Sequence, residues 1–555
     1  MPEPLVLTVR SSLPAGPAVP QRSANAHPAS ADGASRKLPA PWGPHYSGRG
    51  TPTRGFVPGR FCARAEGPAT PTGKARERAE GVDGSVSRDG RRGGKSLESY
   101  LRELVRGRPA DYVEVRLEET HVTTVSFRGP VLDQVGETTS FGGNVRALVK
   151  GGWGFVSFTR LEDLEAKVAL AIRQAKLVSK DRPKPLKLAP VPVVRDIVRP
   201  EVGEDPRRVP LSAKKELLEG YNRQIMAWGP PIVTSSVSYF DRHRHIRFAN
   251  SEGTYIDQEL LDVAGVFWAA AARGGVTQIR HYTFGSSSTF GVARGLEAQV
   301  EEVCRKAAAL LDAPVVQGGV YPVILDPQLA GVFVHEAFGH LSEADSVDEN
   351  PNLQKVMTLG REFGAPHLHI YDSGSEPGLR GYLRYDDEGV PTRKTYLVRE
   401  GKLVGRLHSR ETAAKMGEEP TGNARAVDWR FPPICRMRTT GIEPGEASFE
   451  EMLEGIELGV YAVGSYGGQT AGEMFTFTAG EAYMIRNGKL AEMVRDVTLT
   501  GNVFETLRNI DLIGRDPASR DGPGGCGKGE QTPLAVSFRS PHIRIQNVVV
   551  GGVTR

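Results

Sequence analysis

Two histidines and a glutamate lie close together in the segment GVFVHEAFGHLSEAD, residues 331–345. His335 and Glu336 are adjacent, and His340 follows the first histidine after five positions. A hydrolytic zinc ion needs about three protein ligands, an open position for water and a nearby base. The residue types suit this chemistry, but the zinc-protease signature His-Glu-x-x-His separates its histidines by only four positions. The apolar neighbours predict a buried helix, in which the three residues could instead be hydrogen-bonded core residues.

The five-residue spacing sets a geometric condition on this helix. In a regular α-helix, five residues turn the chain by about 500°, which leaves the two imidazoles roughly 140° apart around the axis. A π-helical turn would bring fifth neighbours onto one face, and Gly339 could absorb the distortion because glycine is conformationally permissive. The sequence therefore predicts a helix that begins after Asp326-Pro327 and widens between His335 and His340.

Three acidic residues accompany the histidines. Glu336 is predicted to be the general base, since it would lie beside a metal held by its neighbours; the alternative is a salt-bridged helix glutamate. Glu343 and Asp345 follow His340 by about one turn. They could accept hydrogen bonds that orient a ligand imidazole, or they could form a solvated helix end.

Two further histidine pairs have the i, i+2 spacing that places side chains on one side of a strand. They are His243 with His245, and His367 with His369. Neither pair has an obvious base beside it. The segment DRHRHIR around the first pair is more typical of a charged strand edge than of a metal site.

The cysteines form no CxxC pair, which argues against a disulfide framework or a thiolate zinc ribbon and favours a reducing cytoplasm. Cys526 lies in DGPGGCGKGEQ, where glycines let the backbone pass close to a metal and Lys528 would favour the thiolate. A single cysteine in such a loop is more often only a loop residue. Cys304, on an apolar helix face, and Cys435, after a Pro-Pro turn, are interpreted as packing residues, and Cys62 lies near the N-terminus.

The elements that would position these residues divide the chain into four parts. Residues 1–92 are rich in Pro, Gly, Ser, Ala and Arg and are predicted to be disordered. Residues 96–180 and 203–315 each combine helical periodicity with alternating strands, and a Pro-rich connector separates them. Residues 316–553 begin with a strand and the histidine helix and continue as Gly-punctuated strands. We therefore expect an α+β fold, with small N-terminal α/β units and a β-rich C-terminal domain that carries the metal-site helix.

Several motifs occur in one order along the chain: HEAFGHLSEAD, YDDEGVPTRKTYLVREGKLVG, PTGNARA, VTLTGN and GGCGKGEQTP. Together they resemble the TldD/PmbA family of metallopeptidases, once described as modulators of DNA gyrase, over about residues 96–553. The PmbA-like (TldE) branch lacks the histidine motif, so this chain resembles the TldD branch. The resemblance implies a Zn²⁺ site with His335, His340 and Cys526 as ligands.

The resemblance also implies a cytoplasmic zinc peptidase that acts on unfolded or flexible peptides, which bind in extended form near strands and acidic loops. It would work as a homodimer or as a heterodimer with a TldE/PmbA-like chain. Two alternatives stay open: a non-catalytic regulatory or binding subunit with a structural metal, and a metal-dependent amidase for a small molecule. The acidic segment YDDEGVP, residues 385–391, is interpreted as a solvated loop.

Charge and hydropathy indicate whether nucleic acid or a membrane is a partner of this chain. The net charge is +4, but residues 1–92 carry 14 Lys or Arg against 7 Asp or Glu, so the remaining residues sum to −3. Because the basic excess is confined to the N-terminal segment, the folded part is not expected to bind nucleic acid. The sequence has no run of about 18 apolar residues, so we expect no membrane-spanning helix.

Overall fold

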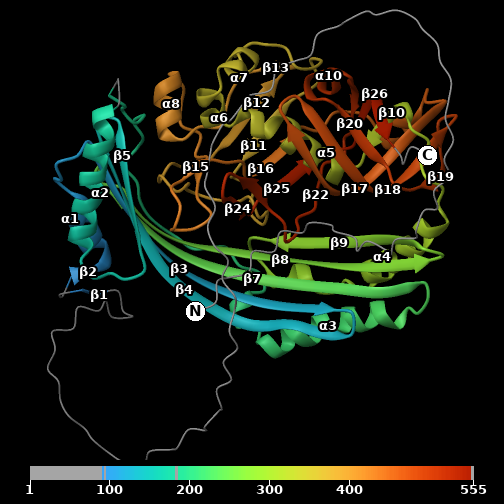
Figure 1. Ribbon diagram of the computed structural model, residues 1–555, viewed down its shortest axis with the longest axis horizontal. Coiled ribbons are helices and arrows are strands. Elements are labelled where there is room, and N and C mark those ends of the chain that lie inside the picture. The colour runs from blue at the N-terminus through green and yellow to red at the C-terminus, as the bar shows by residue number, and fades with distance from the viewer. Residues whose placement is uncertain (1–90, 93–94, 182–184, 552–555) are drawn as a thin grey trace, which may run out of the picture. The chain divides into compact units, whose positions relative to one another are not determined.

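The computed structural model describes residues 91–92, 95–181 and 185–551 (Figure 1). The segment predicted to be disordered, residues 1–92, lies outside the described residues except for β1 (Arg91–Arg92), which pairs with β2 (Lys95–Ser96). Every helix within the described ranges is too short or too polar to cross a membrane.

Seven strands of the N-terminal half form one sheet in the order β5-β4-β3-β7-β8-β6, with β9 paired to β8. Along β7, buried and less buried residues alternate, as expected for a strand with one covered face. The sheet joins strands from residues 96–180 with strands from residues 203–315, and the predicted boundary between those two units stays a prediction. The strands are β3 (Tyr112–Arg128), β4 (Val131–Val149), β5 (Gly152–Phe158), β6 (Arg195–Val198), β7 (Ile232–Asn250), β8 (Tyr255–Arg273) and β9 (Val276–Ser286).

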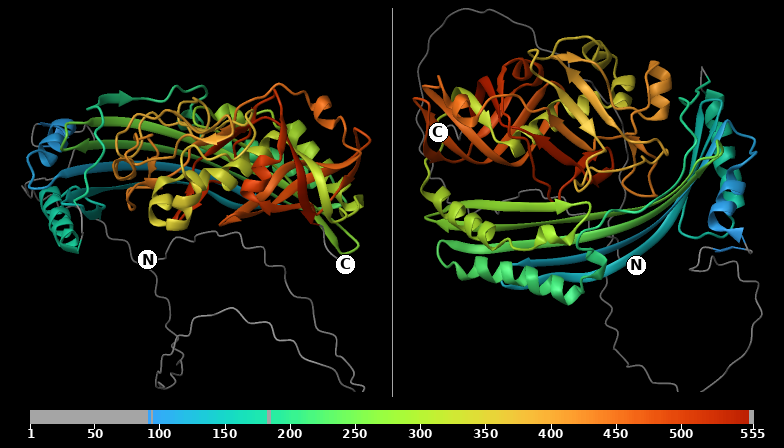
Figure 2. Two further views of the ribbon diagram at one scale, coloured as in Figure 1. Left: turned by 90° about the horizontal axis from the view of Figure 1, so that it is seen from above. Right: turned by 180° about the vertical axis from the view of Figure 1, so that it is seen from behind.

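Four helices cover parts of this sheet. Figure 2 shows that they lie in two groups, α1 with α2 and α3 with α4. Leu101 of α1 and Val168 of α2 share one core cluster with β3 and β4, whereas Leu218 of α3 and Cys304 of α4 belong to a second cluster with β7 and β8. Apolar residues at helical spacing drive this packing. The helices are α1 (Leu97–Val105), α2 (Leu164–Val178), α3 (Leu211–Ala227) and α4 (Glu297–Asp312).

The C-terminal half contains a second seven-stranded sheet, in the order β10-β17-β18-β20-β26-β21 with β19 paired to β18. β10 pairs with both β17 and β26, so β10, β17, β18, β20 and β26 close into a ring without a free edge. The strands are β10 (Gly319–Leu325), β17 (Leu458–Ala471), β18 (Met474–Arg486), β19 (Lys489–Val494), β20 (Thr498–Asn502), β21 (Ile510–Ile513) and β26 (Ile543–Gly551).

A six-stranded sheet lies next to the ring, in the order β13-β12-β11-β16-β25-β22. Helix α5 (Pro327–Val334), which follows β10 directly, contacts β17 of the ring and β16 and β25 of this sheet. Phe333 of α5 makes edge-to-face contacts with Phe475 and Phe477, so the helix is fixed within the largest core cluster. The strands are β11 (Ile370–Ser373), β12 (Lys394–Arg399), β13 (Lys402–Leu403), β16 (Thr439–Ile442), β22 (Ala518–Ser519) and β25 (Ser537–Ser540).

The remaining short elements complete an α+β fold with a β-rich C-terminal domain, as predicted from the sequence. They are β14 (Ala424–Arg425) with β15 (Ile434–Cys435), β23 (Cys526–Lys528) with β24 (Gln531–Leu534), and the helices α6 (Ala344–Glu349), α7 (Pro351–Val356), α8 (Arg410–Met416), α9 (Phe449–Leu453) and α10 (Val503–Arg508).

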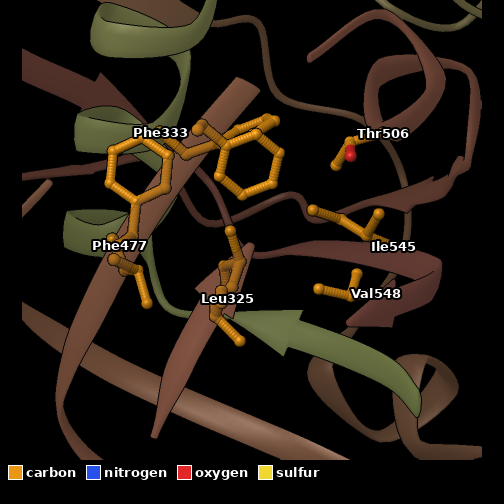
Figure 3. Close-up of a pocket in the computed structure, with 9 residues that line it drawn as sticks. Leu325, Phe333, Phe477, Thr506, Ile545 and Val548 are labelled. Carbon is orange, nitrogen blue, oxygen red and sulfur yellow. The ribbon is translucent and has the colours of Figure 1, made fainter. Parts of the chain in front are cut away.

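A small cavity lies in the core beside α5 (Figure 3). Its volume is about 10 Å³, and apolar side chains such as Leu325, Phe333 and Phe477 line it. A single water needs roughly 10–15 Å³ and two or more polar partners. The cavity is therefore a packing gap and not a ligand site.

Candidate metal centre

The helix that carries the histidines begins where the sequence predicts. The Asp326 side chain caps α5 by accepting a hydrogen bond from the backbone of Leu329 at 2.9 Å, and Pro327 occupies the first turn. The same carboxylate accepts a second bond from the backbone of Gly464 at 2.9 Å, which ties the helix start to β17.

The predicted π-helical turn is confirmed. Residues His335–Gly339 form a π-helix, and the backbone N–H of His340 donates to the carbonyl of His335, which is an i to i+5 bond. The reason for Gly339 differs from the predicted one, because its φ of −58° is ordinary helical geometry. A Cβ atom at Gly339 would instead lie 2.0 Å from the sulfur of Met437, so the position has no room for a side chain.

The wider turn brings both imidazoles into one space with the sulfur of Cys526. Donor atoms of His335, His340 and Cys526 all lie within 4.8 Å of one another. The His340 Nε2 is 3.3 Å from the Cys526 sulfur, and the two imidazole centroids are 5.2 Å apart. His335 and Cys526 are buried, whereas the His340 side chain is 25% exposed. The predicted convergence is confirmed, while the role of these residues as metal ligands stays a prediction.

Hydrogen bonds to the Nδ1 atoms orient both rings. His335 Nδ1 lies 3.3 Å from the hydroxyl of Thr440, which donates to Asp372 at 3.3 Å. His340 Nδ1 lies 3.1 Å from the buried carboxylate of Glu343, so of the two alternatives that the sequence left open for Glu343, the structure has the one in which it orients an imidazole. These contacts leave each Nε2 free for the shared space, as in metal sites where the second ring nitrogen is held by an acceptor.

Lys528 and Asp345 have other partners than the sequence suggested. Lys528 Nζ contacts Asp345 at 2.5 Å, Glu343 at 3.1 Å and the Cys435 carbonyl at 3.1 Å, and no contact with the Cys526 sulfur is found among the described residues. Asp345 also accepts a bond from the backbone of Cys435 at 3.0 Å. The lysine therefore lies between the two carboxylates and offsets their charge. Asp345 binds Lys528 and the backbone of β15, and it does not orient an imidazole.

The two histidines have opposite protonation tendencies. Burial, together with His340 and Arg436, holds the pKa of His335 well below its usual value, so this imidazole is neutral. Burial would also lower the pKa of His340, but its hydrogen bonds to Cys526 and Glu343 raise it to about 10. Burial raises the pKa of Glu336, whose carboxylate lies 3.9 Å from His340 Nε2.

A pocket of about 470 Å³ opens beside this cluster. Glu336, His335 and Cys526 line it on one side, and His281 and Thr283 of β9 line it on another. The glycine-rich stretches Ser465–Gly468 and Arg520–Gly525 complete the wall. The volume is typical of sites that take small molecules or short peptide segments.

The other histidine pairs have no such arrangement. His243 pairs with Glu259 at 3.0 Å and His245 pairs with Asp257 at 2.8 Å, which confirms the interpretation of a charged strand. His367 and His369 contact different backbone groups. His367 lies 3.1 Å from the carbonyl of Ile510, and His369 accepts from the backbone N–H of Glu400 at 3.4 Å.

Cys304 and Cys435 are packing residues, as predicted. Both are buried, and burial raises the pKa of their thiols to about 11 and about 12 respectively. Neither belongs to a group of three potential metal donors within the described residues.

The acidic segment YDDEGVP is not a solvated loop, and that interpretation was wrong. Asp386 and Glu388 are 2% and 3% exposed. Asp386 accepts three backbone bonds, from Glu388, Val390 and Ala424 at 2.9–3.0 Å, and Glu388 pairs with Arg146 of β4 at 3.0 Å. The segment therefore joins the C-terminal domain to the N-terminal sheet.

Comparisons with known proteins agree with this architecture. Three domain models of the PmbA/TldA metallopeptidase family match the chain: domain 1 over residues 113–175, the central domain over residues 204–311 and the C-terminal domain over residues 318–552. A metalloprotease of Synechocystis sp. is 47% identical over 444 residues, which cover 80% of this chain and 95% of the relative. A zinc metalloprotease TldD homolog of Saccharolobus solfataricus is 30% identical and covers 80% of this chain and 97% of its own length.

Solved structures share the fold. A protein of Thermotoga maritima described as a modulator of a DNA gyrase has a TM-score of 0.65 at 22% identity, covering 79% of this chain and 96% of its own. TldE of Thermococcus kodakarensis has a TM-score of 0.63 at 18% identity, covering 82% and 99%. The matched domains, together with relatives that align over nearly their full length, place this chain in the PmbA/TldD family of metallopeptidases.

Proposed function

We propose that this protein is a zinc-dependent peptidase of the TldD branch that hydrolyses peptide bonds in unfolded or flexible peptides. The observation that carries the proposal is the convergence of His335, His340 and Cys526 beside a pocket that His335, Glu336 and Cys526 line. A purely structural metal is usually held by four protein ligands in a closed site. Three donors beside an open pocket suit a catalytic site better.

The donor set fits zinc. Two imidazole nitrogens and one thiolate are common ligands of Zn²⁺, and the Nδ1 partners Thr440 and Glu343 keep the two Nε2 atoms available. His335, His340 and Cys526 would hold the ion. When bound, zinc would polarise the substrate carbonyl and make water more acidic.

Glu336 is the proposed catalytic residue. Its carboxylate lines the pocket and comes from the same turn as both histidines. In the proposed reaction, Glu336 takes a proton from the water that attacks the peptide carbonyl and delivers it to the leaving amine. Burial raises the pKa of Glu336, which makes its carboxylate a stronger base.

The substrate class follows from the strand beside the pocket. β9 pairs only with β8 among the described residues, and its residues His281 and Thr283 line the pocket. An extended peptide could therefore pair with backbone groups of β9 while its scissile bond lies near Glu336. Recognition through the backbone reads little side-chain sequence, so unfolded segments are accepted and folded proteins are excluded.

We also propose a cytoplasmic location and a dimer, either of two copies of this chain or with a TldE/PmbA-like chain. The support for the location is the free state of Cys304, Cys435 and Cys526. The support for the partner is the shared fold with a TldE protein.

Incubation of the purified full chain with a mixture of unstructured peptides tests the function. Mass spectrometry should find new peptide termini when zinc is present and none after chelation. The matched controls are the Glu336→Gln variant and Glu219→Gln, which alters a half-buried ion pair with Lys215 on α3. Intact peptides under all conditions would favour a regulatory subunit with a structural metal.

A further inference from the structure

A second, smaller cavity lies where the N-terminal sheet meets the C-terminal domain, apart from the metal-site pocket. Its volume is about 50 Å³, and none of His335, Glu336 and Cys526 lines it. One water needs roughly 10–15 Å³, so several waters or one small ion would fit, whereas a nucleotide would not. The charged lining residues are Arg242, Arg244, Asp262, Arg380, Asp387 and Arg425.

Three of the nearby arginines have their own carboxylates. Arg380 binds Asp262 through two hydrogen bonds of 2.5 and 3.0 Å. Arg244 binds Glu118 in the same two-pronged way, at 2.8 and 3.0 Å. Arg116, just behind the cavity, pairs with Asp387 at 2.8 Å and shares Glu118.

The other two arginines lack a counter-ion of their own. Among the described residues, the one ion pair of Arg242 is with Asp262 at 3.4 Å, and that carboxylate is already held by Arg380. Arg425 donates to the carbonyls of Met437 and Ala535, at 2.6 and 2.8 Å, which are neutral acceptors. Four arginines and two carboxylates thus line the cavity, which is an excess of two positive charges in its lining.

Both of these arginines have a lowered pKa, and burial is the main cause for each. Burial, with the neighbouring Arg436 and Arg438, lowers the pKa of Arg425 to about 9. Burial also lowers the pKa of Arg242. Buried cations are costly unless an opposite charge is supplied, and guanidinium groups are well suited to bind the oxygens of a small oxyanion.

We propose that this cavity binds one inorganic oxyanion, phosphate or sulfate, between Arg242 and Arg425. The site does not depend on the proposed peptidase activity. It is nevertheless linked to the Cys526 loop, because Arg380 also donates to the carbonyl of Gly524 at 2.9 Å and its backbone N–H donates to Asp521 at 2.9 Å.

Thermal unfolding of the full chain tests the proposal. Phosphate, sulfate or acetate is titrated against chloride at constant ionic strength and pH. Because a ligand that binds only the folded state raises Tm, phosphate and sulfate should each give a saturable rise of a few degrees, and acetate should give little. Calorimetric titration of phosphate into the protein should show one site per chain.

Three variants show whether the rise of Tm comes from an anion bound at this cavity. Arg242→Gln should abolish the saturable rise and, because it removes an uncompensated cation, should raise Tm in anion-free buffer. Arg486→Gln, which alters an exposed pair with Glu492, should respond like the wild type. Cys526→Ser should also respond like the wild type, which separates this site from phosphate held by a metal.

Two results would overturn the proposal. One is an equal rise of Tm in the wild type and Arg242→Gln, since this would be the general effect of excluded salts. The other is a calorimetric titration without a saturable site in the wild type, which decides the matter even if Arg242→Gln does not fold.

Discussion

The Nε2 atom of His340 lies 3.3 Å from the sulfur of Cys526, although 186 positions separate the two residues along the chain. One residue comes from a π-helical turn after α5, and the other begins the short strand β23. Residues of α5 and of the C-terminal glycine-rich loop line the same pocket, so the two segments meet at this contact. Substitutions in the histidine turn or in the Cys526 loop should therefore change the affinity for a metal ion.

Replacing Glu336 by Gln should separate catalysis from metal binding. Glutamine keeps the size of the side chain but cannot accept the proton, so kcat should fall roughly 10²-fold or more. Zinc content should be unchanged, because Glu336 is not one of the three converging donors. Peptide turnover and atomic absorption on the same samples check this, and full turnover in the variant would refute the proposed base.

Cys526→Ser should weaken zinc binding, whereas Cys304→Ser should leave it intact. Both cysteines are buried, but only Cys526 lies near the two histidines. Serine is a much poorer zinc ligand than a thiolate. Zinc stoichiometry after dialysis against a mild chelator should fall toward zero for Cys526→Ser alone. Equal retention by both variants would mean that the sulfur is not a ligand.

Gly339→Ala should destabilise the histidine turn. The added methyl would meet the Met437 sulfur at 2.0 Å, and overpacking of this kind costs about 1–3 kcal/mol. Introduced into a Met437→Ala background, the same change should cost less, because the opposing atoms are gone. Denaturant unfolding of the four proteins of this cycle measures the difference. Equal costs in both backgrounds would show that the contact is not responsible.

Acidification should weaken the fold through His281. Burial, with the nearby Arg280 and Arg520, lowers its pKa to about 4 from about 6.5. A depressed folded-state pKa contributes stability that is present above pH 6.5 and is lost as the pH falls through 4. The difference between a pKa of about 4 and one of about 6.5 corresponds to a loss of at most about 3 kcal/mol in the free energy of unfolding. Water reaches the partly exposed side chain and makes the loss smaller. His281→Gln should reduce the pH dependence between 6.5 and 4 in thermal unfolding, and an unchanged profile would contradict this assignment.

Local features of the sequence predicted the local features of the site. Asp326-Pro327 predicted the helix start, and the five-residue spacing of His335 and His340 predicted the π-turn, because both depend on neighbours along one helix. For Glu343 the sequence left two alternatives open, a partner of His340 and a solvated helix end. Cys526 entered through the family resemblance, since its own loop offered only glycines and a lysine.

Features that depend on distant strands could not be predicted. Thr440 and Asp372, which orient His335, lie on β16 and β11, and no spacing pattern connects them to the histidine. Burial of Glu388 was missed because its partner Arg146 belongs to the N-terminal sheet, and burial of Asp386 was missed because backbone N–H groups, which no residue type reveals, satisfy it. A run of acids predicts exposure unless the tertiary structure supplies opposite charges.

The histidines and the cysteine of the candidate site are held in place by different parts of the fold. The histidines depend on the closed ring of strands β10, β17, β18, β20 and β26. Since β10 leads directly into α5, the histidines are attached to a strand whose two neighbours must separate before it can move. Amide protons of α5 should therefore exchange with deuterium only in nearly global opening events. Cys526 belongs instead to the short ribbon of β23 and β24, which is held from outside by the buried Arg436, a donor to the carbonyls of Cys526 at 2.6 Å and Gln531 at 3.0 Å. The two histidines therefore depend for their position on the ring, whereas the Cys526 sulfur depends on one buried guanidinium, that of Arg436.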